Sequence, residues 1–211
     1  MPAFVVVPAN PDDLEAVTRV QFDAWANDAG FKLIFPKGPT PDTIQHTVNQ
    51  LENDMDNDLT RHLMLVKDAF TGEIAAYAIW HFYPQRGHDE IEREMLTDHF
   101  PLPRDADLEI GNRLTHNGVR KHHEVVAKHL GHVLFAVGTS PKFLRQGAAT
   151  MLVKWGIERA DDLHLPCYLE SSPAARNIYA KHGFEEVDQL KLEAPTDGNF
   201  YHICMVRPSP T

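Results

Sequence analysis

The sequence predicts an α/β sandwich, in which helices cover a sheet. Two observations support this fold class. Apolar strand-like runs alternate with helical segments in the C-terminal half, and residues 62–83 hold two apolar runs joined by a Thr71-Gly72 turn, which is typical of a hairpin. The chain has 211 residues, of which 43% are hydrophobic and 24% charged, so we expect one globular domain over residues 1–211.

The N-terminal part is predicted to form a strand and two helices. Residues 3–7 (AFVVV) are apolar and form the first expected strand. Apolar residues then recur at helical spacing over residues 14–28, and Asn10 or Asp12 is placed to cap this helix. After a break that contains proline and glycine, we expect a second helix over residues 41–53.

The hairpin is followed by a segment with a looser pattern, residues 84–130. It contains charged and histidine-bearing helical stretches interrupted by Pro101 and Pro103, and we expect it to be an insertion or cap. Regular alternation then returns. The elements predicted there are a strand at 132–139, a helix at 148–163, a strand at 166–171, a helix at 173–183, and strands at 184–192 and 200–206.

Charge and composition exclude several classes of protein. The formal net charge is −10, so the overall positive charge expected of a nucleic-acid-binding protein is missing. No apolar stretch approaches the length of a transmembrane helix, and no signal peptide is evident. Cys167 and Cys204 are expected to be reduced core thiols. We therefore expect a cytoplasmic protein that binds neither nucleic acid nor membrane.

The start of the helix at 148–163 indicates an anion site. Gly147, Ala148 and Ala149 leave the backbone open at this helix start, and Lys142 and Arg145 add positive charge beside it. Unpaired N–H groups at a helix start bind phosphate well when no side chain blocks the approach. An ordinary helix start with small residues for packing remains the alternative, since the segment lacks both the Walker and the dinucleotide-binding patterns.

Two segments carry a family resemblance. Residues 137–149 (VGTSPKFLRQGAA) resemble the acyl-CoA-binding segment of the GNAT superfamily of N-acetyltransferases, and residues 172–184 (SPAARNIYAKHGF) resemble the stretch that follows it in that family. The resemblance covers about residues 132–206. Leu144 departs from the family pattern by replacing a polar residue, and Ser172 stands where asparagine is usual.

The resemblance implies the GNAT acyl-CoA N-acyltransferase fold. This is a mixed, mostly antiparallel sheet with helices on both faces and a V-shaped splay between the fourth and fifth strands. It also implies acetyl-CoA as the cofactor. The residues assigned to it are Val137, Gly138, Thr139, Lys142, Leu144, Arg145, Gln146, Gly147, Ala148, Ala149, Thr150, Ser172, Ala175 and Arg176.

The implied reaction is direct acetyl transfer to an amine in a ternary complex, which requires an acid and a base. Tyr179 matches the tyrosine of the second segment and is expected to protonate the thiolate, although it could be a core residue. The strand positions expected to hold the base are Val133 and Phe135, which cannot accept a proton. Glu170 is therefore the preferred base, or a structural carboxylate. His132 is the second choice for the base. Side chains alternate along a strand, so His132 is expected on the other face of the sheet unless a bulge intervenes.

The acceptor is expected to be a primary amine of a small molecule or peptide, bound by a monomer or homodimer. We expect aromatic residues near the first two helices and the hairpin to contact it. These residues could equally belong to the core. They are Trp25, Phe31, Phe35, Trp80, His81 and Tyr83. The 13 histidines show no pattern that specifies a metal site, so none is expected. The alternative function is an acyl-CoA-binding sensor or scaffold with weak catalysis. Transfer to a hydroxyl group also stays open.

Overall fold

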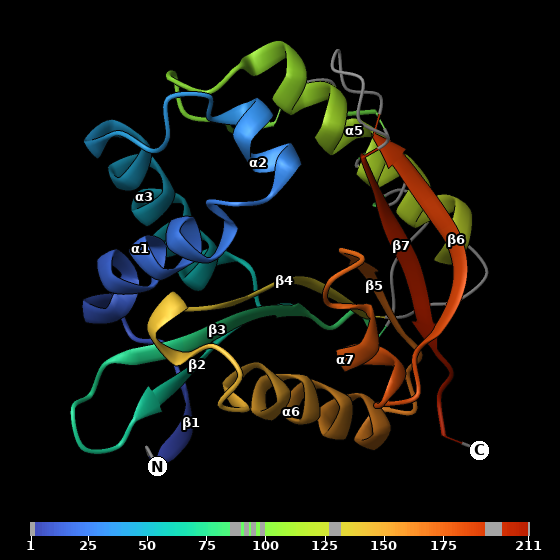
Figure 1. Ribbon diagram of the computed structural model, residues 1–211. Coiled ribbons are helices and arrows are strands. Elements are labelled where there is room, and N and C mark those ends of the chain that lie inside the picture. Colours follow the sequence, from blue (N-terminus) through green and yellow to red (C-terminus); the bar gives the residue numbers. More distant parts are fainter. Residues whose placement is uncertain are drawn as a thin grey trace.

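The computed structural model describes residues 3–84, 90, 93, 96–97, 100–126, 132–192 and 200–210. Its centre is a seven-stranded sheet with the order β1-β2-β3-β4-β5-β7-β6 (Figure 1). The strands are β1 (Phe4–Pro8), β2 (Arg61–Asp68), β3 (Ile74–His81), β4 (His132–Thr139), β5 (Cys167–Ser171), β6 (Glu185–Leu192) and β7 (Phe200–Arg207). Neighbouring strands are antiparallel except β4 and β5, which are parallel.

Helices cover both faces of this sheet (Figure 1). They are α1 (Leu14–Trp25), α2 (Ala29–Ile34), α3 (Pro41–Asn57), α5 (Leu108–Val126), α6 (Ala148–Asp162) and α7 (Arg176–Ala180). Helix α1 packs on β3 and β4 from one face, while α6 packs on β2, β3 and β4 from the other. The predicted α/β sandwich is thereby confirmed.

Local sequence signals explain where the N-terminal helices begin. Asn10 forms a capping box with Asp13 around a short 3-10 turn that leads into α1. Thr40 caps α3 in the same way, with Pro41 at the first helical position, where its missing N–H has no cost. Helix α3 runs four residues beyond the predicted end at residue 53, and the six-residue helix α2 was not predicted.

Strands β4 and β5 separate after a short paired stretch. Only residues 132–134 of β4 pair with residues 167–169 of β5, and residues 135–139 have no β5 partner among the described residues. The backbone groups on that edge of β4 therefore face a gap between the strands and are available to a ligand. This is the V-shaped splay that the resemblance implied.

A β-bulge interrupts β4 beside this splay. Ile79 of β3 pairs with Ala136 and Trp80 pairs with Leu134, so Phe135 is an extra residue in β4. A bulge changes the side-chain alternation along a strand. The parity argument that made His132 the second choice therefore does not hold across residue 135, and the side chains of residues 132–135 lie outside the described part of the structure.

The core lies against both faces of the sheet. On the α6 face, Trp80 is completely buried and packs against Gly156 of α6, where an ideal Cβ would lie 2.0 Å from the Trp80 ring. A second buried cluster joins Leu114 of α5 to Tyr168 and Leu190 on the opposite face. The second half of the predicted cap segment is thus a helix that packs on the sheet.

Some expectations fall on residues that the structure does not describe. These are the Asp197-Gly198 turn and most of residues 85–99. Among the helices that are described, none combines the length and apolar composition needed to cross a bilayer.

Candidate active site

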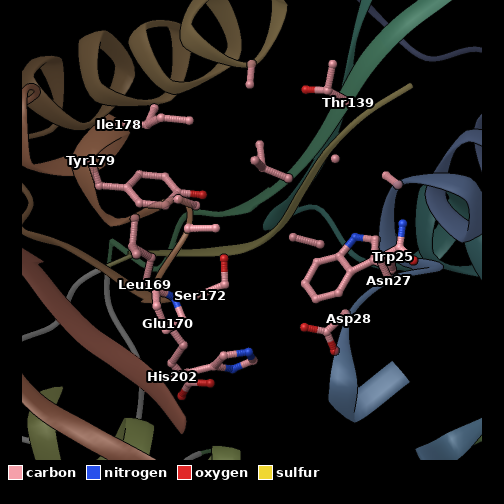
Figure 2. Close-up of a pocket in the computed structure, with 18 of the residues that line it drawn as sticks. Trp25, Asn27, Asp28, Thr139, Leu169, Glu170, Ser172, Ile178, Tyr179 and His202 are labelled. Carbon is pink, nitrogen blue, oxygen red and sulfur yellow. The ribbon is translucent and has the colours of Figure 1, made fainter. Parts of the chain in front are cut away.

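A cavity of about 620 Å³ lies where β4 and β5 diverge. It extends through the sheet, because residues from both faces line it (Figure 2). Trp25 and Asp28, at the end of α1 and just before α2, lie on one side. Tyr179 of α7 and Ala149 of α6 lie on the other. A ligand in this cavity would therefore contact the splayed edge of β4 and both helical layers.

The start of α6 presents unpaired backbone N–H groups. Gly147, the residue before the helix, has a φ of 88° and no side-chain cap. The first helical hydrogen bond runs from Met151 N to Gly147 O at 3.2 Å, so the preceding amides lack a partner within the helix. This arrangement, with Ala149 in the cavity wall, suits an anionic group such as a phosphate.

The two cations beside this helix start differ in their surroundings. Lys142 Nζ donates to both carboxylate oxygens of Glu73, at 2.5 and 2.7 Å, and both side chains are exposed. Arg145 is exposed, has a positive φ of 60°, and forms no hydrogen bond or ion pair with the described residues. Arg145 is therefore the cation that is ready to contact a bound anion, since Lys142 must first leave Glu73.

Close packing brings α1 to the splayed part of β4. Gly138 lies under Tyr77, and an ideal Cβ there would be 2.4 Å from the Tyr77 ring. The Tyr77 hydroxyl accepts a hydrogen bond of 2.8 Å from Trp25 Nε1. The Trp25 indole is thus held at the cavity by a contact between α1 and β3.

Tyr179 points into the cavity from α7 (Figure 2). Its side chain is 6% exposed and packs edge-on against Phe184, with ring centroids 5.9 Å apart. Burial raises the pKa of the Tyr179 phenol to about 12, and no described residue hydrogen-bonds to its hydroxyl. A buried phenol without a partner is suited to donate a proton to a ligand.

Glu170 of β5 lines the cavity on the face of the sheet that α5 covers. The Tyr168 hydroxyl donates to Glu170 Oε1 at 2.9 Å, and burial raises the pKa of this carboxyl to about 7. An ideal Cβ at Gly118 would lie 3.8 Å from Glu170 Oε2, so α5 runs close to the carboxylate. A carboxylate that titrates near neutral pH is suited to general base catalysis.

His202 shares this face of the sheet with Glu170. Glu170 pairs with Cys204 across the β5–β7 ladder, and His202 is two residues before Cys204 on β7. Burial lowers the pKa of the His202 imidazole, while the nearby negative charge of Asp28 opposes that shift. The part of the cavity on the α1 side thus brings together titratable groups from three elements (Figure 2).

Comparisons with known proteins find a family similar to part of the chain. The model of the acetyltransferase (GNAT) family matches residues 110–184, from α5 through α7. This part of the chain is similar to the acetyltransferase (GNAT) family. The matched part holds the α6 start, Glu170 and Tyr179, so the GNAT match covers the centre of the cavity.

Similar proteins extend this result to the fold. Over 45 residues the chain is 38% identical to the Probable acyltransferase SID5 of Ajellomyces capsulatus. The aligned stretch covers 21% of this chain and 33% of that relative. The match thus spans about a third of the length of this curated relative. A histone acetyltransferase HPA2 and related acetyltransferase from Corynebacterium glutamicum has a TM-score of 0.61 at 20% identity, over 100% of this chain and 98% of that one.

Two further solved structures have the same GNAT fold. Mosquito arylalkylamine N-acetyltransferase like 5b has a TM-score of 0.67 at 14% identity, over 97% of this chain and 99% of that one. A phosphinothricin acetyltransferase from Sinorhizobium meliloti, solved with AcCoA, has a TM-score of 0.60 at 13% identity, over 98% and 88% of the two chains. At these identities the likeness shows the fold.

The structure brings about half of the predicted GNAT cofactor residues to the cavity. Those that line it are Val137, Gly138, Thr139, Leu144, Ala149, Ser172 and Ala175. Gly147, Ala148 and Thr150 belong to the adjoining helix start. Gln146 donates to Lys142 O, while Arg176 forms an ion pair with Glu186 of β6 and does not line the cavity.

Most of the predicted acceptor residues lie elsewhere. Trp25 lines the cavity, but Trp80 is a core residue with 0% exposure, so it cannot contact an acceptor. Phe31 and Phe35 pack on each other with ring centroids 5.0 Å apart, next to Phe22. The remaining pair, His81 and Tyr83, stack on each other near Asp58 and do not line the cavity either.

Sequence reasoning missed Asp28, Tyr168 and His202. Tyr168 had a signal, because residues two apart on a strand share a face and Glu170 had been singled out. Asp28 had the signal of a helix cap before an apolar run. His202 could not be found this way, since its place beside Glu170 depends on the register between β5 and β7.

Proposed function

We propose that this chain is an N-acetyltransferase that transfers an acetyl group from acetyl-CoA to a primary amine of a small molecule or peptide, directly within a ternary complex. One observation carries the proposal. The uncapped start of α6 and the hydroxyl of the buried Tyr179, which has no hydrogen-bond partner among the described residues, border the same cavity at the β4–β5 splay. A site suited to an anion and a proton donor therefore lie beside the same edge of β4, whose backbone groups are open to a ligand.

The residues present fit acetyl-CoA. Backbone amides at Ala148 and Ala149, with Arg145 beside them, would hold its diphosphate, and the open edge of β4 at Val137 and Thr139 would hold its pantetheine arm. A side chain at Gly138 would collide with Tyr77, so the glycine keeps this edge close to α1. When bound, acetyl-CoA supplies an activated thioester.

Two side chains would move the protons. The Glu170 carboxylate takes a proton from the ammonium form of the acceptor, which makes its nitrogen nucleophilic. The N–C bond forms, the C–S bond breaks, and the Tyr179 hydroxyl gives its proton to the departing sulfur. The nitrogen then loses its second proton, which restores the Tyr179 phenol, and the proton on Glu170 passes to solvent, so the products are a neutral amide and a thiol. The burial of both groups supports these roles, because it raises the pKa of Glu170 to about 7 and keeps Tyr179 protonated at neutral pH.

The experiment is steady-state release of CoA from acetyl-CoA with a panel of primary amines. We expect amine-dependent turnover, and we expect Tyr179→Phe to lower kcat by about 10²-fold with little change in KM for acetyl-CoA. The matched control is Tyr201→Phe, since Tyr201 is a partly buried tyrosine outside the cavity. Saturable acetyl-CoA binding without turnover for any amine would instead support a binding module.

A further inference from the structure

The α1 side of the cavity is acidic. Asp28 and Glu170 line it, and the residues that the structure assigns to the cavity wall include no lysine or arginine. In Figure 2 the Asp28 carboxylate lies below Trp25, and Glu170 and His202 lie across the opening from it. A cationic ligand is therefore favoured here over a neutral or anionic one.

The two carboxylates have different partners. Glu170 is held by the Tyr168 hydroxyl on the strand that borders the splay. Asp28 Oδ1 accepts the backbone N–H of Phe31 at 2.9 Å, which fixes the side chain and leaves Oδ2 without a hydrogen-bond partner among the described residues. Asp28 is therefore oriented by the backbone and keeps one oxygen for a ligand.

An aromatic surface accompanies Asp28. The Trp25 indole N–H is already used by Tyr77, so its ring can contact a ligand only through its faces and edges. Figure 2 shows this ring next to the Asp28 carboxylate. An aromatic ring beside a carboxylate is a favourable site for an ammonium or guanidinium group.

Tyr179 indicates where the reacting end of a ligand would lie. The Tyr179 hydroxyl, on a side chain that is 94% buried, has no partner among the described residues and points into the same cavity from its far side. Glu170 of β5 lines the same cavity and lies across the opening from Asp28 (Figure 2). The cavity therefore has a proton-transfer end and a distinct cation-binding end.

We infer that the amine acceptor carries a second positive charge, as a diamine or a guanidino amine does, and that Asp28 and Trp25 bind this distal group. This inference rests on the proposed function and names its substrate class. The reacting nitrogen must be neutral when it attacks, so its charge is lost to Glu170. A distal cation keeps its charge throughout and remains paired with Asp28.

The test compares 1,4-diaminobutane with 1-aminobutane, two acceptors that differ only in the distal amine. We expect the wild-type protein to favour the diamine by about tenfold or more in kcat/KM and, with CoA bound, in affinity measured by calorimetry, as expected for one charge-assisted contact. Asp28→Asn should bring the two amines within about threefold of each other, the level expected for loss of that contact.

The variant is chosen to preserve the fold. The amide oxygen of asparagine can accept the Phe31 N–H as the carboxylate does, and asparagine is a good helix cap. Glu158→Gln is the matched control, because it removes one negative charge from an exposed position on α6 outside the cavity. It should leave the preference for the diamine intact.

The outcomes separate this inference from the proposed function. Turnover of both amines at equal kcat/KM, or a preference that survives in Asp28→Asn, overturns the inference and leaves acetyl transfer standing. Asp28-dependent binding of the diamine without turnover of any amine supports the cation site and overturns the proposed acetyltransferase.

Discussion

At the scale of single residues, Glu170 and Tyr179 acquire their chemistry from burial. A carboxyl group normally titrates well below neutral pH, but burial raises the pKa of Glu170 to about 7. Burial raises the pKa of the Tyr179 phenol as well, so the phenol stays protonated at neutral pH. One group is therefore ready to accept a proton and the other to donate one under the same conditions.

The raised pKa of Glu170 predicts a pH dependence. The base accepts a proton only as the carboxylate, so kcat/KM for an amine should rise with pH through about 7 and fall by about tenfold for each pH unit below it. Glu170→Gln keeps an oxygen for the Tyr168 hydroxyl but cannot accept the proton. We expect it to abolish this rise in the pH profile.

Glu158→Gln is again the control, since it alters an exposed carboxyl outside the cavity. It should keep the wild-type profile. A Glu170→Gln variant that also retained the wild-type profile and rate would contradict the assignment of Glu170 as base.

At the scale of elements, the start of α6 depends on a left-handed glycine. Gly147 has a φ of 88°, and an added Cβ would meet no atom within 4 Å, so the cost of a side chain is conformational. We expect Gly147→Ala to lower the free energy of unfolding by about 1 kcal/mol. CoA affinity should fall by about tenfold, roughly one charge-assisted hydrogen bond.

Gly72→Ala provides the comparison. Gly72 has a φ of 73° in the β2–β3 turn and equally open surroundings. Urea denaturation should show a similar loss of stability, but calorimetry should show unchanged CoA affinity. Equal CoA affinity in the two variants would argue against phosphate binding at the α6 start.

The same elements show what the sequence can predict. The helix start at Gly147 is encoded by adjacent residues, so its small side chains and flanking cations were visible in one short segment. The bulge at Phe135 was invisible, because it is defined only by the register of β4 against β3. Alternation along one strand could not reveal it.

At the scale of the whole molecule, the cavity exists because distant parts of the chain meet at the splay. The α6 and α7 side was predictable from two local segments that resemble one family. The acceptor side was not, since Asp28 and His202 are far apart in sequence and meet across the opening between the α1 layer and β7. The presence of an aromatic side chain was the reason to expect Trp80 at the acceptor site, but Trp80 is buried in the core.

The most direct test of the whole account is a crystal structure of the protein with CoA. The account predicts diphosphate oxygens within hydrogen-bonding distance of the backbone amides at Ala148 and Ala149, and the sulfur beside the Tyr179 hydroxyl in the β4–β5 splay. A CoA molecule bound elsewhere, or one whose sulfur lies outside this cavity, would contradict it.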